Sequence, residues 1–106
     1  MFVAINFIDC DVHYQERFEE LFQSRAGEID TMPGFQRMEV LRPLENGGEY
    51  LIMSHWDDEE SFKQWTKSNA FIKGHSRGFE DIRKAKEAGQ KPPMRSSFKT
   101  YNIISQ

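Results

Sequence analysis

The N-terminal segment FVAINFI (Phe2–Ile8) sets requirements that the rest of the chain has to meet. Its content of β-branched and aromatic residues predicts a β-strand. Because alternate side chains of a strand point to opposite faces, one face carries Val3, Ile5 and Phe7, and the other is apolar except for Asn6. A strand that is apolar on both sides is covered on both sides. The sheet containing this segment therefore needs a cover on each face.

The hydrophobic periodicity of the remaining chain predicts a β-α-β-β-α-β order. The expected elements after Phe2–Ile8 are a helix at Tyr14–Ala26, strands at Phe35–Leu41 and Tyr50–Trp56 joined by a hairpin at Asn46-Gly47-Gly48, a helix that starts at Asp57-Asp58-Glu59-Glu60, short helices at Ala70–His75 and Phe79–Ala88, and a strand at Ser97–Ser105. This is the α+β, ferredoxin-like plait, whose four-stranded antiparallel sheet carries helices on one face. We expect a second copy of the chain to cover the other face, sheet against sheet, as a dimeric α+β barrel.

Two details of the helical region are also expected from sequence. Asp57 with Glu60 three residues later resembles a capping box, and Ser68-Asn69 looks like a break followed by a fresh cap. Gly74 and Gly78 are expected to end the short helix that carries His75.

Composition places the chain among globular domains of ordinary size. With 106 residues it is expected to form one domain over 1–106, and its formal charge of -3 without a basic stripe argues against nucleic acid as a partner. No apolar run approaches the roughly 20 residues of a membrane span, and the first residues lack the pattern of a signal peptide. Cys10 is the single cysteine, so neither an intrachain disulfide nor a thiolate metal cluster is available. The cytoplasm is the expected location.

Several chemistries lack their motif in this sequence. There is no G-x-G-x-x-G or Walker-type loop for a nucleotide and no G-x-S-x-G for a serine nucleophile. Cys10 stands between two aspartates, a poor setting for a reactive thiolate.

Three residues are candidates for a ligand site. His75 ends the expected short helix beside Phe71 and Gly74; a surface histidine is the commoner case, but one imidazole suffices to ligate a heme. Asn6 is an amide in a strand that is otherwise apolar, and either a hydrogen bond to a nearby loop or a donor aimed at a ligand accounts for it. Trp65 is, by frequency, a core residue.

The sequence as a whole resembles the antibiotic biosynthesis monooxygenase superfamily, and within it the IsdG-type and HmoA-type heme-degrading monooxygenases. The resemblance is carried by the strand with Asn6, by the turn Met32-Pro33-Gly34-Phe35, and above all by the spacing of Trp56, Trp65 and His75. The helix at Tyr14–Ala26 and the chain after Phe79 contribute little to it.

This resemblance implies a function and a set of site residues. It implies that His75 is the proximal ligand of the heme iron, that Asn6 hydrogen-bonds the iron-bound oxygen, and that Trp65 presses on the porphyrin and buckles it. Heme would then be both cofactor and substrate, opened with O2 and external electrons from a separate reductase, with release of iron. Further contacts with the heme are expected from Phe22, Phe62 and Phe71, and with its propionates from Arg25, Arg77 or Arg83.

Two other functions remain open from the sequence. One is a cofactor-independent monooxygenase of the same superfamily that oxidises an aromatic polyketide or quinol and needs no axial histidine. The other is a dimeric module that binds heme or another hydrophobic ligand without catalysis.

Overall fold

The computed structural model describes residues 1–24 and 27–106 of the chain. Strands β1 (Phe2–Cys10), β2 (Phe35–Leu41), β3 (Tyr50–Trp56) and β4 (Met94–Asn102) form an antiparallel sheet in the order β2-β3-β1-β4. Helices α1 (Gln15–Gln23), α2 (Glu59–Thr66) and α3 (Asn69–Glu87) complete it, with 3-10 turns at Val12–Tyr14 and Glu28–Thr31. This is the expected α+β ferredoxin-like fold.

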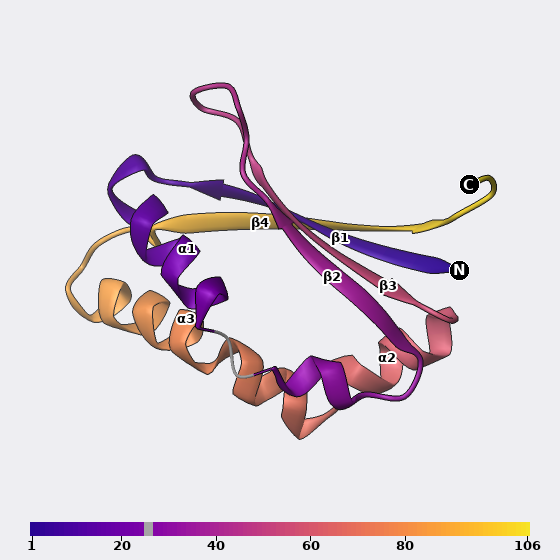
Figure 1. The fold of residues 1–106 in the computed structure, drawn as a ribbon. Helices are drawn as coiled ribbons and strands as arrows, with labels where there is room; N and C mark the ends of the chain where they lie inside the picture. Colours follow the sequence, from indigo (N-terminus) through magenta and orange to yellow (C-terminus); the bar gives the residue numbers. More distant parts are fainter. Residues whose placement is uncertain (25–26) are drawn as a thin grey trace.

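All three helices lie on the same side of the sheet, and the connection between β2 and β3 projects beyond it (Figure 1). In the described part of the chain, none of the helices combines the length and hydrophobicity that crossing a membrane requires.

The strand predictions are confirmed, with shifts at the two ends of the chain. β2 and β3 have the expected bounds, whereas β1 continues two residues further, to Cys10. β4 begins at Met94 rather than Ser97 and ends at Asn102. The early start follows from pairing, because Met94 lies opposite Cys10 in the register of β1 and β4.

The first helix is shorter than expected. Tyr14 belongs to the preceding 3-10 turn, and α1 runs from Gln15 to Gln23; Ala26, the expected last residue, lies outside the described residues. Gly27, which follows the expected last residue of this helix, adopts a positive φ of 73°, a conformation that glycine accepts without steric cost.

The expected break at Gly74 and Gly78 is wrong, since α3 is one continuous helix of 19 residues. A glycine inside a helix costs only about 1 kcal/mol relative to alanine, which tertiary packing can offset. At Gly78 such packing is present: a Cβ there would lie 3.7 Å from Met94 and 4.0 Å from Leu21. Both distances are ordinary van der Waals contacts, so α3 packs beside β4 and α1 at this position.

The N-terminal cap of α2 differs from the predicted one, whereas that of α3 is the predicted residue. Asp58, not Asp57, caps α2, and its Oδ1 accepts hydrogen bonds of 2.8 Å from both the backbone N–H and the hydroxyl of Ser61. Asp57 instead accepts a hydrogen bond from Gln36. The expected fresh cap is confirmed, because the Ser68 hydroxyl accepts the Phe71 N–H at 3.2 Å.

The hydrophobic core between sheet and helices is divided into two clusters. One contains Phe2, Ala4, Ile29, Trp56 and Phe62, and the other contains Ile8, Tyr14, Phe18 and Tyr50. On the helix side of β1, Ala4 belongs to the first cluster and Ile8 to the second. Asn6 lies between them.

The opposite face of the sheet carries apolar side chains without a helix over them. It includes Val3, Ile5 and Phe7 of β1 and Met53 of β3, and Ile5 and Met53 are paired in register. His55 on this face is 5% exposed; its Nε2 lies 3.1 Å from Glu39 Oε2 on the neighbouring strand, without the alignment of a hydrogen bond. His55 thus makes a cross-strand contact between β3 and β2.

Candidate functional site

A cavity of about 620 Å³ lies between the sheet and α3, above the gap between the two core clusters. Side chains from β1, β3 and β4 form its floor, and α1, α2 and α3 form its walls. Most of the lining is apolar or aromatic, and among the described residues its ionisable side chains are Glu28, His75 and Arg77. Such a space suits a bulky apolar ligand with few ionic contacts.

The wall made by α3 explains why a chain of this size leaves a cavity unfilled. The helix has the periodicity of an amphipathic helix, yet none of its 19 residues is buried. An apolar helix face is normally stabilised by packing on a core. Here that face lies over the cavity, so its apolar residues remain partly accessible and available to a ligand.

His75 lines this cavity from α3, and one of its two ring nitrogens is engaged in a hydrogen bond. Its Nδ1 lies 2.7 Å from the carbonyl oxygen of Phe71, one helical turn earlier. A carbonyl oxygen can only accept a hydrogen bond, so Nδ1 carries the proton and donates it. In the neutral ring, Nε2 then keeps its lone pair. This is the arrangement in which protein histidines commonly ligate metals.

Asn6 lies in the floor of the same cavity, on the strand at the centre of the fold. Its in-register neighbours are Ile52 on β3 and Phe98 on β4, both of which also line the cavity. Within the described residues, no protein group forms a hydrogen bond with its side-chain amide. The loop partner considered from the sequence is therefore not found among these residues, and the amide remains free to bind a ligand.

Trp65 lines the cavity from α2 and connects it to the core. Its ring lies 5.6 Å from Trp56, 4.9 Å from Phe71 and 5.8 Å from His75, measured between centroids. The indole Nε1 is buried and has no hydrogen-bond partner in the described part of the chain. Because that nitrogen is inaccessible although the residue lines the cavity, it is the carbon surface of the ring that faces a ligand.

The three phenylalanines expected to contact the ligand, Phe22, Phe62 and Phe71, all line the cavity. Among the described lining residues, the structure adds three aromatic residues that the sequence did not single out, namely Phe18, Phe79 and Phe98. Phe98 stacks on Phe62 at 5.7 Å, and Phe79 stacks on His75 at 5.4 Å. Phe79 was hidden by the expected helix break, since only a continuous helix places it one turn after His75. Phe98 becomes visible only through the register of β4 with Asn6.

The arginines expected near the propionates differ in their surroundings. Arg77 lines the cavity, but its guanidinium donates to the Leu21 and Ser24 carbonyl oxygens and the Ser24 hydroxyl, which fastens the end of α1 to α3. Arg83 does not line the cavity and is paired with Glu80 and Glu87 on its own helix. Arg25 lies outside the described residues.

A second link between α1 and α3 stands at the other end of α1. Asp81 accepts hydrogen bonds from the Tyr14 hydroxyl at 2.5 Å and from Arg17 Nε at 3.0 Å. Burial favours the neutral carboxyl, but these two bonds outweigh it and hold the pKa of Asp81 below its usual range. Burial, with the bond to Asp81, raises the pKa of Tyr14. The walls on either side of the cavity are thereby fixed to each other.

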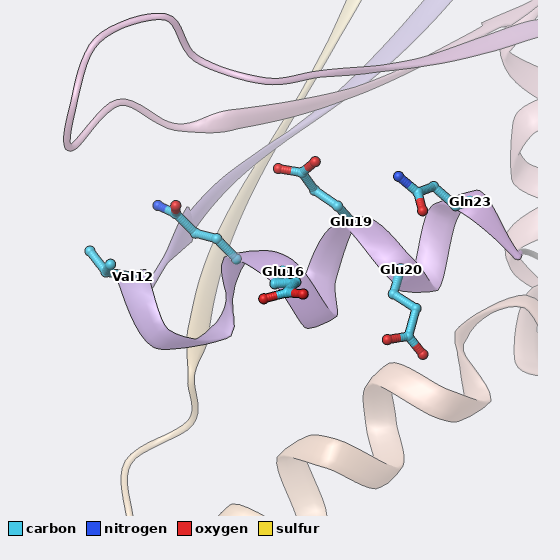
Figure 2. A pocket seen from close by; sticks show the side chains of 6 residues that line it. Val12, Glu16, Glu19, Glu20 and Gln23 are labelled. Atoms are coloured by element: carbon cyan, nitrogen blue, oxygen red, sulfur yellow. The ribbon is translucent and has the colours of Figure 1, made fainter.

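A further hollow runs along the outer side of α1 and is shown in Figure 2. Apart from Val12, its lining is polar or acidic: Gln15, Glu16, Glu19, Glu20 and Gln23. Glu19 is held by Arg42 and Tyr50. No group of three or more His, Cys, Asp or Glu among the described residues is placed to hold a metal. This hollow therefore lacks the features of the apolar cavity.

Cys10 is unsuited to nucleophilic chemistry, as its sequence setting indicated. Burial, with the neighbouring Asp11 carboxylate, raises the pKa of the thiol to about 11. The thiolate is the reactive form.

Comparison with known proteins gives a family for most of the chain. Residues 1–77 match the model of the family described as "Antibiotic biosynthesis monooxygenase". Two curated relatives, each named "Heme oxygenase (mycobilin-producing)", come from the CDC 1551 / Oshkosh and ATCC 25618 / H37Rv strains of Mycobacterium tuberculosis. Each is 31% identical over 68 residues, which cover 64% of this chain and 65% of the relative.

Solved structures share the fold over nearly the whole chain. MhuD from Mycobacterium tuberculosis, determined with two hemes bound in its active site, has a TM-score of 0.73 and 24% identity, with 100% of this chain and 98% of that chain covered. A mutant form of SnoaB from Streptomyces nogalater, a cofactor-independent oxygenase, has a TM-score of 0.70 and 18% identity, with 99% and 94% covered. At these identities the likeness is one of fold.

Proposed function

The chain belongs to the antibiotic biosynthesis monooxygenase family, and we propose that within it the chain is a heme-degrading monooxygenase. The observation that carries this proposal is the state of His75. Its Nδ1 proton is donated to the Phe71 carbonyl oxygen, and the residue lines a large apolar cavity, so that Nε2 is the nitrogen available to an iron atom. A cofactor-independent oxygenase has no need for such a ligand.

The residues of the cavity fit heme in three respects. The cavity of about 620 Å³ lies within the range of ordinary cofactor sites. Its aromatic walls match a flat apolar ring, and a porphyrin supplies four of the iron ligands, so one imidazole completes the protein's share. Finally, Asn6 provides, in the floor of the cavity, an amide that has no hydrogen-bond partner among the described residues. In this proposal His75 holds the iron, and Phe22, Phe62 and Phe71 hold the ring.

The chemistry divides between the ligand and the chain's own residues. Bound heme supplies the iron centre that activates O2, and its porphyrin is the substrate that is opened. The chain orients the ring, excludes water with aromatic side chains, and offers the Asn6 amide as a hydrogen-bond donor on the sheet side. Trp65 presents its carbon surface to the ring, where close packing would distort a planar macrocycle. Distortion is one means by which proteins change heme reactivity.

O2 and electrons must come from outside the chain. The sequence has no flavin or nicotinamide motif, so a separate reductase is the proposed electron donor, and iron is released when the ring opens. The proposed location is the cytoplasm, in keeping with a single cysteine and no disulfide.

We also propose that the chain acts as a homodimer joined through the open face of its sheet. On that face, Tyr101 and Leu41 keep 46% and 40% of their surface accessible to solvent in the single chain. Val3, which is paired with Tyr101 in register, is only 5% exposed. Exposed apolar side chains on a sheet face that no helix covers are typical of an interaction site. A second copy would place the same apolar residues against it, as a two-fold interface requires.

A hemin titration followed by aerobic reduction tests the function. The wild type is expected to give a Soret band at one hemin per chain, and then, with ascorbate or a reductase under air, to bleach while iron and an open-chain pigment appear. His75→Ala is expected to lose the band. His13→Ala, which removes an exposed histidine, is the matched control and should behave as the wild type.

The two alternatives give different results in this experiment. A cofactor-independent monooxygenase would show no Soret band that depends on His75. A non-catalytic module would show the band but no bleaching, no iron release and no pigment. Either result overturns the proposal.

A further inference from the structure

We propose that Phe79 is a positioning residue that, with Phe71, holds the imidazole of His75 in one orientation. The proposal rests on the function proposed above and names a residue which that function does not require. It starts from the spacing of three side chains along α3. Phe71, His75 and Phe79 are separated by four residues each and therefore stand in one row on the helix surface.

The imidazole lies between two phenyl rings in this row. The centroid distance to Phe71 is 4.1 Å with 30° between ring planes, and the distance to Phe79 is 5.4 Å with 23°. The two aromatic neighbours restrict the χ angles of His75 from both sides. The hydrogen bond from Nδ1 to the Phe71 carbonyl oxygen fixes χ2 of His75, because a flip of the ring would take Nδ1 away from that oxygen.

Phe79 has no evident role in stabilising the fold. It is 51% exposed and belongs to neither core cluster. A large aromatic side chain left half exposed at the margin of a cavity gains little by burial. Its contacts with His75 and with the cavity are what distinguish it from Ile72, which is 60% exposed on the same helix and does not line the cavity.

The benefit of the row is pre-organisation. Helical side chains have two common χ1 wells. If removal of Phe79 lets the imidazole occupy both, the fraction in the binding-competent orientation falls, and apparent affinity falls by the same factor. We expect roughly a two- to fivefold weaker hemin affinity for Phe79→Ala, since a single aromatic contact changes equilibria by about this amount.

The test combines a measurement on the ligand-free protein with one on its hemin complex. In NMR spectra of the ligand-free chain, the carbon-bound ring protons of His75 should be shifted upfield by the two phenyl rings. Phe79→Ala and Phe79→Leu should reduce that shift, Phe79→Tyr should retain it, and Ile72→Ala is the matched control that should leave it unchanged. Phe79→Leu keeps apolar volume, so it remains informative if the alanine variant unfolds.

The hemin complexes give the second measurement. The ferric EPR spectrum should show one sharp species for the wild type, Phe79→Tyr and Ile72→Ala, and a broadened mixture for Phe79→Ala and Phe79→Leu. Unchanged NMR shifts and EPR spectra in Phe79→Ala would overturn the positioning role. Failure of the proposed function has a different signature: hemin affinity would be the same in His75→Ala as in the wild type, while the NMR measurement would still decide the orientation of the ring.

Discussion

Asn6 of β1 lies directly opposite Phe98 of β4 in the antiparallel register, and both residues line the large cavity. The amide thus stands between apolar neighbours, in a strand where asparagine is disfavoured. A chain selected for stability alone would carry an apolar, β-branched residue at this position.

The first prediction follows from this conflict between stability and function. Asn6→Val should raise the free energy of unfolding by up to about 1 kcal/mol while slowing heme ring opening by roughly tenfold or more. Hemin affinity should change little, because His75 still provides the iron ligand. Asn102→Val, on exposed β4 outside the cavity, is the control and should leave the ring-opening rate unchanged. Full activity in Asn6→Val would remove Asn6 from the site.

The two tryptophans should respond differently to replacement by phenylalanine. Trp56 is 0% exposed and donates from Nε1 to the Ser54 hydroxyl at 2.9 Å, so Trp56→Phe should cost about 1–3 kcal/mol through a lost hydrogen bond and a cavity. Trp65→Phe breaks no hydrogen bond within the described residues and should cost less. Its main effect should be a fall in the yield of opened pigment, since Trp65 lines the cavity. Thermal unfolding and pigment mass measure the two effects; the reverse order would contradict this assignment.

The pH dependence of stability should reflect Glu19. Hydrogen bonds from Arg42 and then Tyr50 lower the pKa of this carboxyl from 4.5 to about 2 in the folded chain. A depressed folded-state pKa stabilises the fold above the unfolded value, and this contribution is lost as the pH falls from about 5 towards 2. The Tm of the wild type should therefore exceed that of Glu19→Gln at pH 7, and the difference should shrink over this range. Glu16→Gln, which removes a charge from the same helix without breaking an ion pair of the described chain, should show no such convergence.

A single charged substitution on the open face of the sheet should disrupt the proposed dimer without unfolding the chain. Met53→Glu places a carboxylate on the open face of the sheet beside Ile5, its partner in register, and should convert a dimer into a monomer in light scattering after size-exclusion chromatography. Leu44→Glu alters a side chain that is fully exposed on the β2–β3 connection and should remain dimeric. A wild type that is monomeric at all concentrations tested would exclude this interface.

The fold was largely predictable from the sequence because its signals are local. The alternation of apolar residues located β2 and β3 at their observed bounds, and Ser68 signalled the start of α3. The errors arose where distant contacts override local preference. Gly74 and Gly78 indicated a break in α3, yet the helix is continuous, and at Gly78 it packs beside Met94 and Leu21. Asp57 and Asp58 are equally good caps by type, and the folded chain uses Asp58, while Asp57 accepts a hydrogen bond from Gln36.

For the candidate site, the family resemblance pointed to Asn6, Trp65 and His75 but gave no geometry. Their placement around one cavity depends on strand register and on the height of α3 above the sheet. Phe79 and Phe98 escaped notice for the same reason. The engagement of Arg77 with the end of α1 was also invisible, because its acceptors are carbonyl oxygens more than fifty residues away in sequence.

The amino-acid order was thus sufficient for the strands and for the polar interruption by Asn6 within Phe2–Ile8, because each is a property of neighbouring residues. The split core, the cavity between its halves and the row of rings around His75 arise when segments far apart in sequence pack together. Packing distances of this kind depend on the shapes of several elements at once, and no pattern within one element contains them.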